Sequence, residues 1–234
     1  MKTLGIIGGI APGSTVDYYR LLIESYRERR PDGSYPSILI NSIDLTRMLG
    51  LVAGQRLEEL TTWLLAEVER LARAGADLGL LASNTPHIVF EELRQQSPIP
   101  LLSIVEAACE AAGALGLETV GLLGTRFTME GRFYPEVFAR RGIVVRPPTL
   151  EDQALVHEKY MTELVPGQFR RDTQRQFLAV IERLREAGAQ GVLLAGTELP
   201  LLLRDAGECG LPLLDTSRIH VSRAVTELLA REAV

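Results

Sequence analysis

The chain has 234 residues, of which 46% are hydrophobic and 24% charged, enough apolar material for one large or two small buried cores. Its formal net charge of −5 excludes the basic surface that nucleic-acid-binding proteins present to phosphates, so we expect no nucleic-acid partner. No apolar run is long enough to span a membrane, and residue 2 leads into a strand pattern instead of a signal peptide. We therefore expect no membrane contact and a cytoplasmic location.

Short apolar runs alternate with helical stretches, which predicts βα units around mostly parallel sheets. The strands predicted in the first half are residues 4–7, 37–41, 78–82 and a run that begins at residue 98. The helices predicted there are residues 14–26, with Ser14 or Thr15 as the cap, and 57–74, which Gly75 ends.

The second half continues with a helix at residues 104–115 and strands at 119–123, 142–146, 191–195 and 213–215. A final helix is predicted for residues 217–231. We expect the last strand and helix to return to the first half. This predicts a first α/β domain of residues 1–98 plus 208–234, and a second α/β domain of residues 99–207.

The two halves repeat each other. The matching segments are 69–76 (ERLARAGA) with 182–189 (ERLREAGA), and 80–85 (LLASNT) with 193–198 (LLAGTE), both at an offset of 113 (188 − 75). Earlier in each half, GIIGG at 5–9 matches GLLGT at 121–125, and Tyr18 matches Tyr134, at an offset of 116 (134 − 18). A duplicated unit predicts two pseudo-symmetric α/β domains with a cleft between them. One loop from each half then faces a shared ligand, and Ser83 and Gly196 are equivalent positions on those loops.

Four loops follow predicted strands, at residues 8–15, 83–87, 124–129 and 196–200. Ligands of open α/β sheets bind at the carboxyl ends of the strands, and a helix N-terminus there offers N–H groups and a positive dipole end. The loops also carry short polar side chains: Asn84, Thr85, Thr125 and Thr197. Any one of these can be a simple helix cap, but four paired loops favour a small anionic ligand.

Other residues near these loops have weaker signals. Residues 5–15 lack GxGxxG spacing and a phosphate-binding lysine, so we expect glycines such as Gly9 to allow tight turns and close backbone approach. Arg47 follows the second strand and can reach a carboxylate with its planar guanidinium, although a surface role is equally expected. His87 can orient a neighbour or be structural. A catalytic triad of Ser83 and His87 with an aspartate is disfavoured because GxSxG is absent.

Cys109 and Cys209 form no CxxC pattern, and the three histidines lack metal-ligand spacing. We therefore expect neither a disulfide framework nor a metal site.

Several motifs together resemble the aspartate/glutamate racemase family of cofactor-independent amino-acid racemases. They are residues 5–9 with Ser14, Thr15, Tyr18 and Tyr19; 84–87 (NTPH); 122–125 (LLGT); 197–200 (TELP); and Asp215 and Thr216 with Ile219 and His220. The resemblance covers nearly the whole chain. It implies two pseudo-symmetric α/β domains with the substrate between them, no cofactor, a small carboxylate or acidic amino acid as the ligand, and a homodimer.

The resembled family uses two cysteines, one before Asn-Thr and one before Thr-Glu, as base and acid on opposite faces of the α-carbon. Here those catalytic positions hold Ser83 and Gly196. A serine hydroxyl is a very weak acid and glycine has no side chain, so racemisation by two thiols is not possible. The positions that carry over for substrate binding are Gly9, Arg47, Asn84, Thr85, Thr125, Thr197 and Glu198.

Three functions follow from this pattern, and the sequence leaves open whether the chain is an enzyme. The first is a racemase or isomerase acting on a small acidic amino acid by altered chemistry, with Ser83 as proton donor and Glu198 or water as base. The second is a non-catalytic protein that binds a carboxylate or amino acid. The third is a decarboxylase or lyase of the same fold, for which one proton donor suffices.

Overall fold

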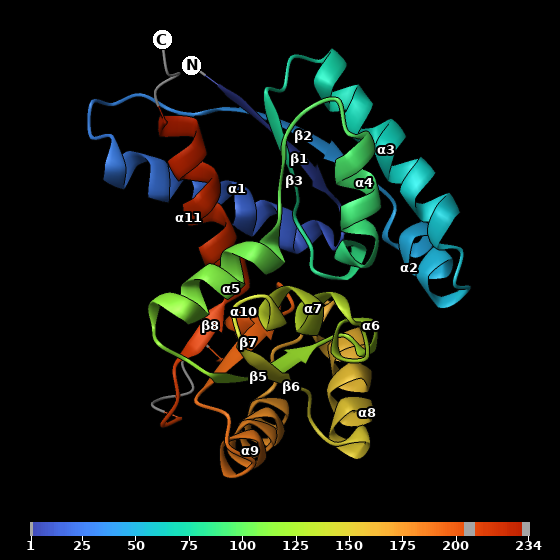
Figure 1. Cartoon of the computed structure of the whole chain (residues 1–234), viewed down its shortest axis with the longest axis vertical. Coiled ribbons are helices and arrows are strands. Elements are labelled where there is room, and N and C mark those ends of the chain that lie inside the picture. The colour runs from blue at the N-terminus through green and yellow to red at the C-terminus, as the bar shows by residue number, and fades with distance from the viewer. Residues whose placement is uncertain (1, 204–208, 231–234) are drawn as a thin grey trace. The chain divides into compact units, whose positions relative to one another are not determined.

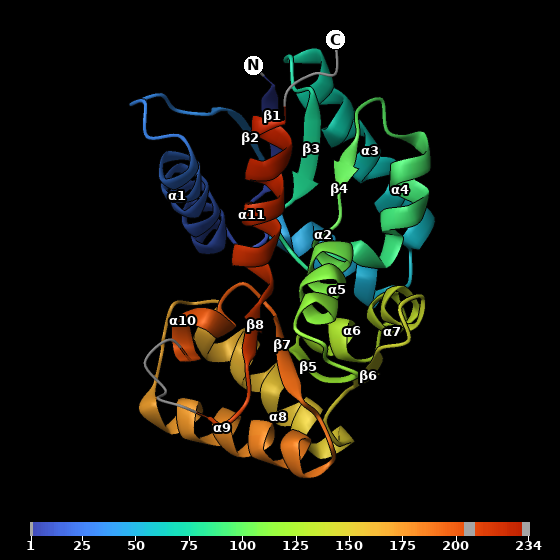
Figure 2. The ribbon, with the colours of Figure 1, turned by 60° about the vertical axis from the view of Figure 1, so that its left-hand side comes forward.

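The computed structural model describes residues 2–203 and 209–230. The chain forms two compact units, residues 1–104 with 220–234 and residues 105–219. Each unit contains a four-stranded parallel sheet with helices packed on it (Figures 1 and 2), which confirms the predicted α/β fold. The unit boundary expected after residue 98 lies after Ile104 instead. The chain returns to the first unit at His220, later than the return expected at residue 208.

The first sheet has the strand order β2-β1-β3-β4. Its strands are β1 (Thr3–Gly8), β2 (Ser37–Ser42), β3 (Leu78–Leu81) and β4 (Leu101–Leu102). In the register of this sheet, Ile6 of β1 lies beside Ile40 of β2 and beside Leu80 of β3. Strands β1 and β3 are buried along nearly their whole length, as expected for central strands of a parallel sheet.

Helices cover both faces of the first sheet. The helical elements of this unit are α1 (Pro12–Arg29), α2 (Leu45–Ala53), α3 (Leu57–Arg73), η1 (Thr85–Val89), α4 (Phe90–Gln96) and the part of α11 (Thr216–Leu229) from His220 on. On one face, Leu4 and Ile6 pack in a core cluster with Leu22 of α1 and Val225 of α11. Helix α3 contacts β1, β2 and β3, and Gly5, which alternates with Leu4 and Ile6, faces α3.

The second sheet repeats the first, in the order β6-β5-β7-β8. Its strands are β5 (Thr119–Gly124), β6 (Val144–Arg146), β7 (Gly191–Ala195) and β8 (Leu213–Asp215). The helical elements of the unit are α5 (Ile104–Ala114), α6 (Arg126–Met129), α7 (Phe133–Ala139), α8 (Leu150–Lys159), the π-helical segment η2 (Tyr160–Leu164), α9 (Arg171–Glu186) and α10 (Leu199–Leu203). Phe177 and Val180 of α9 join Val156 of α8 and Leu194 of β7 in the core of this unit.

From the sequence we expected the last strand to return to the first half, but it does not. Strand β8 pairs in parallel with β7, with Leu214 beside Leu193, and completes the second sheet as the counterpart of β4. The expectation was wrong because each repeat needs its own fourth strand to cover the edge of β3 or β7. The helix that follows does enter the core of the first unit, through Val221 and Ala224.

The first helix begins earlier than predicted. Its N-cap is Ala11, with proline at its first position and no side-chain cap. Ser14 and Thr15 do not cap it. The Thr15 hydroxyl oxygen accepts a hydrogen bond from the Gly9 N–H at 2.8 Å, and the Ser14 hydroxyl donates to the Ala11 carbonyl at 2.8 Å. The two hydroxyls therefore fix the β1–α1 loop.

No helix within residues 2–203 and 209–230 combines the length and the apolar composition that a membrane crossing requires.

Glycines let each central strand approach its helix and its neighbour strand. A Cβ at Gly5 would lie 3.1 Å from Leu71 Cδ1 of α3, and a Cβ at Gly121 would lie 2.9 Å from Leu184 Cδ1 of α9. Leu71 and Leu184 are equivalent in the sequence repeat, so the same close packing is built twice. At the end of β5, a Cβ at Gly124 would lie only 2.6 Å from the Ala195 carbonyl oxygen.

Replacing Gly124 with alanine is therefore expected to destabilise the protein. The added methyl group meets a backbone oxygen that cannot move without disturbing the β5–β7 pairing, and such overpacking costs about 1–3 kcal/mol of unfolding free energy. Urea denaturation followed by circular dichroism measures the change. The matched control is Gly50→Ala in α2, where a Cβ meets nothing within 4 Å and helix propensity adds up to about 1 kcal/mol. Equal effects of the two substitutions would contradict the packing argument.

Candidate functional site

The predicted binding residues of the first unit form a buried polar loop after β3. Ser83, Asn84 and Thr85 are 8%, 3% and 4% exposed. The loop at the same place in the second unit, after β7, contains Thr197 and Glu198, which are 8% and 6% exposed. Burial of this many polar groups at strand ends is unusual for simple connections, which normally lie in solvent.

Most of these loops lack a long helix behind them. The elements after β3, β5 and β7 are η1, α6 and α10, which have five, four and five residues. Only α1, with 18 residues, follows its loop as a full-length helix. The helix-dipole argument made from the sequence is therefore weak for three of the four loops, and recognition there depends on side chains and local N–H groups.

The alternative that these residues are only helix caps fails for two of them. Asn84 is the N-cap of η1 and Thr125 the N-cap of α6, yet neither side chain makes a capping hydrogen bond. The Thr125 hydroxyl lies 3.2 Å from the Thr128 hydroxyl. Two buried polar side chains at strand ends thus have orientations that helix capping does not explain.

The loop after β7 is built around a buried carboxylate. Thr197 Oγ1 donates a hydrogen bond to Glu198 Oε2 at 2.8 Å. Tyr160, the first residue of η2, donates its phenolic proton to the same oxygen. Burial raises the pKa of Tyr160 well above its usual value, and the neighbouring Glu198 charge raises it further. The phenol therefore keeps its proton, and Glu198 is the acceptor.

Tyr160 fills the space beside Gly196. A Cβ added to Gly196 would lie 2.6 Å from Tyr160 Cε2 and 2.8 Å from the Tyr160 hydroxyl oxygen. Gly196 does not have a positive φ, so backbone conformation does not explain the glycine. Its missing side chain makes room for the tyrosine. Sequence reasoning missed Tyr160, because it lies in a polar stretch 36 residues (196 − 160) before the loop that it contacts.

His87 holds the Ser83 backbone and does not activate its hydroxyl. The Ile104 N–H donates to His87 Nε2 at 3.2 Å, so the ring proton sits on Nδ1 and is donated to the Ser83 carbonyl oxygen at 3.0 Å. The ring is also stacked on Phe90, with the centroids 4.7 Å apart. His87 is thus a positioning residue for the Ser83 loop, and the triad disfavoured from the sequence is not formed.

A second buried histidine belongs to the same unit. His220 Nε2 lies 3.0 Å from the Leu102 carbonyl oxygen and must donate to it, so Nδ1 accepts a hydrogen bond from the Tyr18 hydroxyl at 3.1 Å. The two imidazole rings pack edge to face, with centroids 6.3 Å apart. Both rings are neutral with fixed tautomers, so His220 has a structural role.

Gly9 and Arg47 have well-defined surroundings. Gly9 has a φ of 84°, and a Cβ there would lie 2.2 Å from the Ile43 carbonyl oxygen, so only glycine fits the turn after β1. Arg47 lies on the exposed side of α2, with its guanidinium carbon 4.4 Å from the centroid of the Trp63 ring. A cation–π contact thus holds this guanidinium.

Neither cysteine belongs to the polar loops that contain Ser83 and Gly196. Cys109 is on α5, and its Sγ lies 3.9 Å from the Val137 carbonyl oxygen. Burial raises the pKa of this thiol, which disfavours the reactive thiolate. Cys209 contacts the Leu211 carbonyl oxygen at 3.4 Å. Within the described residues, no group of three or more His, Cys, Asp or Glu side chains has an arrangement that holds a metal ion.

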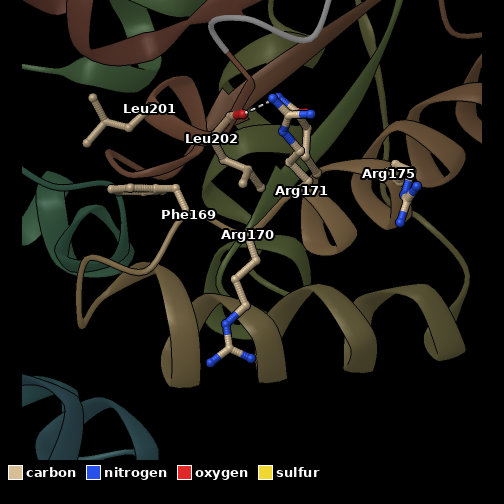
Figure 3. Close-up of a pocket in the computed structure, with 7 residues that line it drawn as sticks. Phe169, Arg170, Arg171, Arg175, Leu201 and Leu202 are labelled. Atoms are coloured by element: carbon tan, nitrogen blue, oxygen red, sulfur yellow. Dashed lines mark hydrogen bonds between the residues drawn. The ribbon is translucent and has the colours of Figure 1, made fainter.

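A cavity of about 590 Å³ opens in the second unit beside the start of α9 (Figure 3). It is lined by Phe169, Arg170, Arg171, Gln174, Arg175, Leu201 and Leu202. Arg170 and Arg175 are mostly exposed and pair with Glu163 and Asp172. None of the site residues expected from the sequence lines this cavity.

Comparisons with known proteins agree on one family. The family described as Asp/Glu/Hydantoin racemase matches residues 7–224. The structure of a putative Asp/Glu racemase from Yersinia pestis has a TM-score of 0.89 and 30% identity, covering 98% of this chain and 100% of that one. An aspartate racemase homologue from Pyrococcus horikoshii has a TM-score of 0.82 and 34% identity, covering 97% and 99%. A broad-specificity amino-acid racemase from Bacillus subtilis is 23% identical over 233 residues, covering 98% of this chain and all of the relative.

The two buried histidines predict a loss of stability in acid. Burial lowers the pKa of His87 to about 3 and that of His220 to about 4, and the nearby His220 further lowers that of His87. In the unfolded chain both return to their ordinary value of 6.5, so below pH 6.5 the unfolded state takes up protons that the folded state does not. Their stabilising contribution is complete above pH 6.5 and is lost as the pH falls towards 4. At pH 5 the loss is on the order of 2 kcal/mol for each histidine.

Urea denaturation at pH 7 and pH 5 measures this effect. The His220→Gln variant lacks one titrating ring, so its unfolding free energy is expected to fall less between the two pH values than that of the wild-type protein. The half-buried His157 provides the control variant His157→Gln, in which the pH dependence stays closer to wild type. If His220→Gln and the wild-type protein lose the same free energy on acidification, the histidine argument is wrong.

Proposed function

The chain belongs to the Asp/Glu/hydantoin racemase family, and we propose that it binds a small acidic amino acid or a similar carboxylate through the loops after β3 and β7. The observation that carries this proposal is the set of buried polar side chains at these strand ends, among which Asn84 makes no capping hydrogen bond. A ligand carboxylate accepts hydrogen bonds from hydroxyl, amide and backbone N–H groups, which are the groups that these loops contain. The homodimer that the resemblance implies is part of the same proposal.

The choice of an acidic ligand rests on the relatives. Two of them are named an Asp/Glu racemase and an aspartate racemase homologue, while a third is named a broad-specificity amino-acid racemase. An anionic group also suits Arg47, whose guanidinium forms paired hydrogen bonds with carboxylates. We therefore assign the ligand class as a small α-amino acid or carboxylate, with aspartate and glutamate as the first candidates.

The proposal excludes a mechanism with two thiols. Position 83 is serine and position 196 is glycine. The pKa of Cys109 is raised by burial on α5, and Cys209 belongs to a different part of the chain. Proton transfer by a pair of thiols at positions 83 and 196 is therefore excluded.

Binding can be tested with isosteric substitutions in each unit. Thr85→Val and Thr197→Val each remove a buried hydroxyl without changing side-chain volume. For Thr85→Val, loss of a hydrogen bond to a charged ligand costs about 1.5–3 kcal/mol, so affinity for L-aspartate or L-glutamate is expected to fall at least about tenfold. Thr197→Val acts indirectly, because it removes the hydrogen bond that orients Glu198, and a smaller loss of affinity is expected. Isothermal titration calorimetry measures the affinity, with malate and sulfate as further ligands and the exposed Thr62→Val as the control. If none of these ligands releases heat or raises the melting temperature at millimolar concentration, the proposed binding function is wrong.

The space taken by Tyr160 decides whether thiols can be reintroduced. A double substitution, Ser83→Cys with Gly196→Cys, places the new Cβ 2.6 Å from the Tyr160 ring, so the second thiol has no room. We expect little or no loss of optical rotation of L-aspartate with this double variant. Adding Tyr160→Ala removes the ring, and the triple variant is expected to racemise aspartate measurably above the double variant. A folded triple variant that binds aspartate but leaves its optical rotation constant would mean that positions 83 and 196 do not face the α-carbon.

A further inference from the structure

The Tyr160–Glu198 pair occupies the position on the second unit that is equivalent to Ser83 on the first. The Tyr160 hydroxyl oxygen lies 2.8 Å from the place where a Cβ of residue 196 would be. Position 196 in turn is the counterpart of Ser83 in the sequence repeat. The hydroxyl oxygen of Tyr160 is therefore closer than van der Waals contact to the space that any side chain at this position would use.

The pair is arranged for proton transfer between its own members. The Tyr160 hydroxyl donates to Glu198 Oε2, and Thr197 Oγ1 donates to the same oxygen at 2.8 Å. Tyr160 is 4% exposed and Glu198 is 6% exposed. In such a dry environment a carboxylate and a phenol interact more strongly than in water, and the hydrogen bond between them is a direct path for a proton once the phenol gains another.

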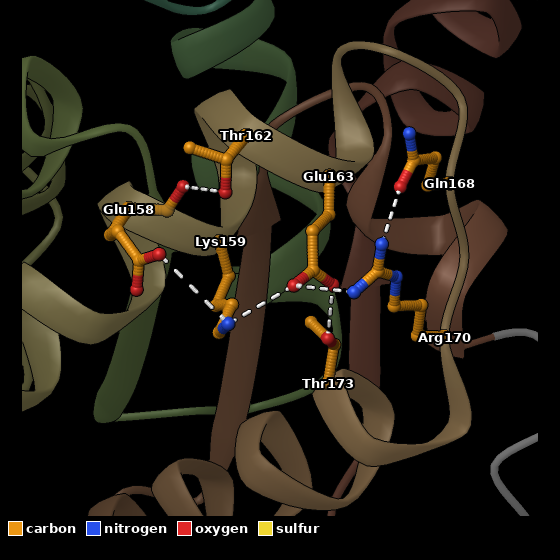
Figure 4. A network of polar contacts seen from close by, with 7 residues as sticks. All are labelled: Glu158, Lys159, Thr162, Glu163, Gln168, Arg170 and Thr173. Atoms are coloured by element: carbon orange, nitrogen blue, oxygen red, sulfur yellow. Dashed lines mark hydrogen bonds and ion pairs between the residues drawn. The ribbon is translucent and has the colours of Figure 1, made fainter.

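The segment that carries Tyr160 is held by a separate network of charges (Figure 4). Tyr160 begins the π-helical turn η2, and π-helical turns are frequent at functional sites. Glu163, in the same turn, accepts hydrogen bonds from Lys159 at 3.0 Å and from Thr173, and lies 3.9 Å from Arg170. Hydrogen bonding from Thr173, followed by Lys159, lowers the pKa of Glu163, so the anchor stays ionised. The network fixes the position of the phenol without using its hydroxyl.

From these contacts we propose that Tyr160 and Glu198 act together as the proton-exchanging group for the α-carbon of the bound amino acid. The α-carbon–hydrogen bond breaks and its proton passes to the Tyr160 oxygen, while the phenolic proton of Tyr160 passes to the Glu198 carboxylate. The electron pair stays on the substrate as an enediolate. The reverse transfer returns a proton from Tyr160 to carbon, and Glu198 recovers its negative charge. Atoms and charge balance without a cofactor or a thiol.

This inference rests on the proposed function, because it needs an amino acid bound at the loops. It adds a stereochemical consequence. One relay on one unit serves one face of the α-carbon, and Ser83, a very weak acid, offers no comparable base for another face. The expected reaction is exchange of the α-hydrogen with solvent at a rate well above the rate of racemisation.

The experiment follows α-hydrogen exchange of L- and D-aspartate and L- and D-glutamate in D₂O by proton NMR. The wild-type protein is expected to exchange the α-hydrogen of one enantiomer. Tyr160→Phe and Glu198→Gln are expected to lower the exchange rate at least about 100-fold, the usual contribution of a positioned acid–base group. Calorimetry of Tyr160→Phe is expected to show binding within a few fold of wild type. The exposed Tyr35→Phe and the double variant Cys109→Ala with Cys209→Ala are the controls, and both should exchange at the wild-type rate.

Each alternative result has a different meaning. Exchange that persists in Tyr160→Phe overturns the inference, and so does exchange that is lost in the cysteine control. Wild-type protein that binds an amino acid but exchanges no α-hydrogen also overturns it, while the proposed binding function stands. Absence of binding overturns the proposed function itself. If Tyr160→Phe fails to fold, iodoacetamide treatment of the wild-type protein is the second measurement: unchanged exchange supports the oxygen relay, and loss of exchange rejects it.

Discussion

The fold depends on close contact between each central strand and the helix beside it. In a parallel sheet covered on both faces, a helix comes especially close to the central strand where that strand lacks a side chain. Gly5 and Gly121 provide this gap in β1 and β5, and Leu71 and Leu184 fill it from α3 and α9. This contact fixes the height of each helix on its sheet. It thereby sets where the next strand, β3 or β7, ends and where its polar loop begins.

The order of helices, strands and polar loops was largely predictable from the sequence, because the same pattern occurs in both halves of the chain. The segments around Gly75 and Gly188 carry the same helix ending, and each leads into a buried strand and a polar loop. Periodicity and glycine placement thus predicted both sheets and the loops after β3 and β7. The fourth strand of the second sheet was assigned to the wrong unit, because the three residues of β8 carry no signal of their partner. Pairing partners of short strands follow from topology, which local sequence does not encode.

In the candidate site too, local motifs were predictable and long-range contacts were not. The polar residues after β3 and β7 are adjacent in sequence, so the motif identified them. The contacts that give them character come from distant residues: Tyr160 reaches Glu198 from 38 residues away, and Ile104 fixes the tautomer of His87 from 17 residues away. From the sequence alone, Gly196 indicates only that a proton-transferring side chain is missing. The structure shows that the missing side chain leaves room for Tyr160 beside Glu198. A larger residue at position 196 would displace Tyr160.

The two units also differ in the order in which the chain can complete them. The second unit is one continuous stretch, residues 105–219, so its sheet and core can form as soon as that stretch exists. The first unit takes the last part of α11 into its core, where Val221 and Val225 pack with Leu4 and Leu22. During synthesis, the apolar face of β1 and α1 therefore has to wait for residues made more than two hundred positions later. The first unit therefore keeps part of its apolar surface uncovered for longer during synthesis, although it is made first.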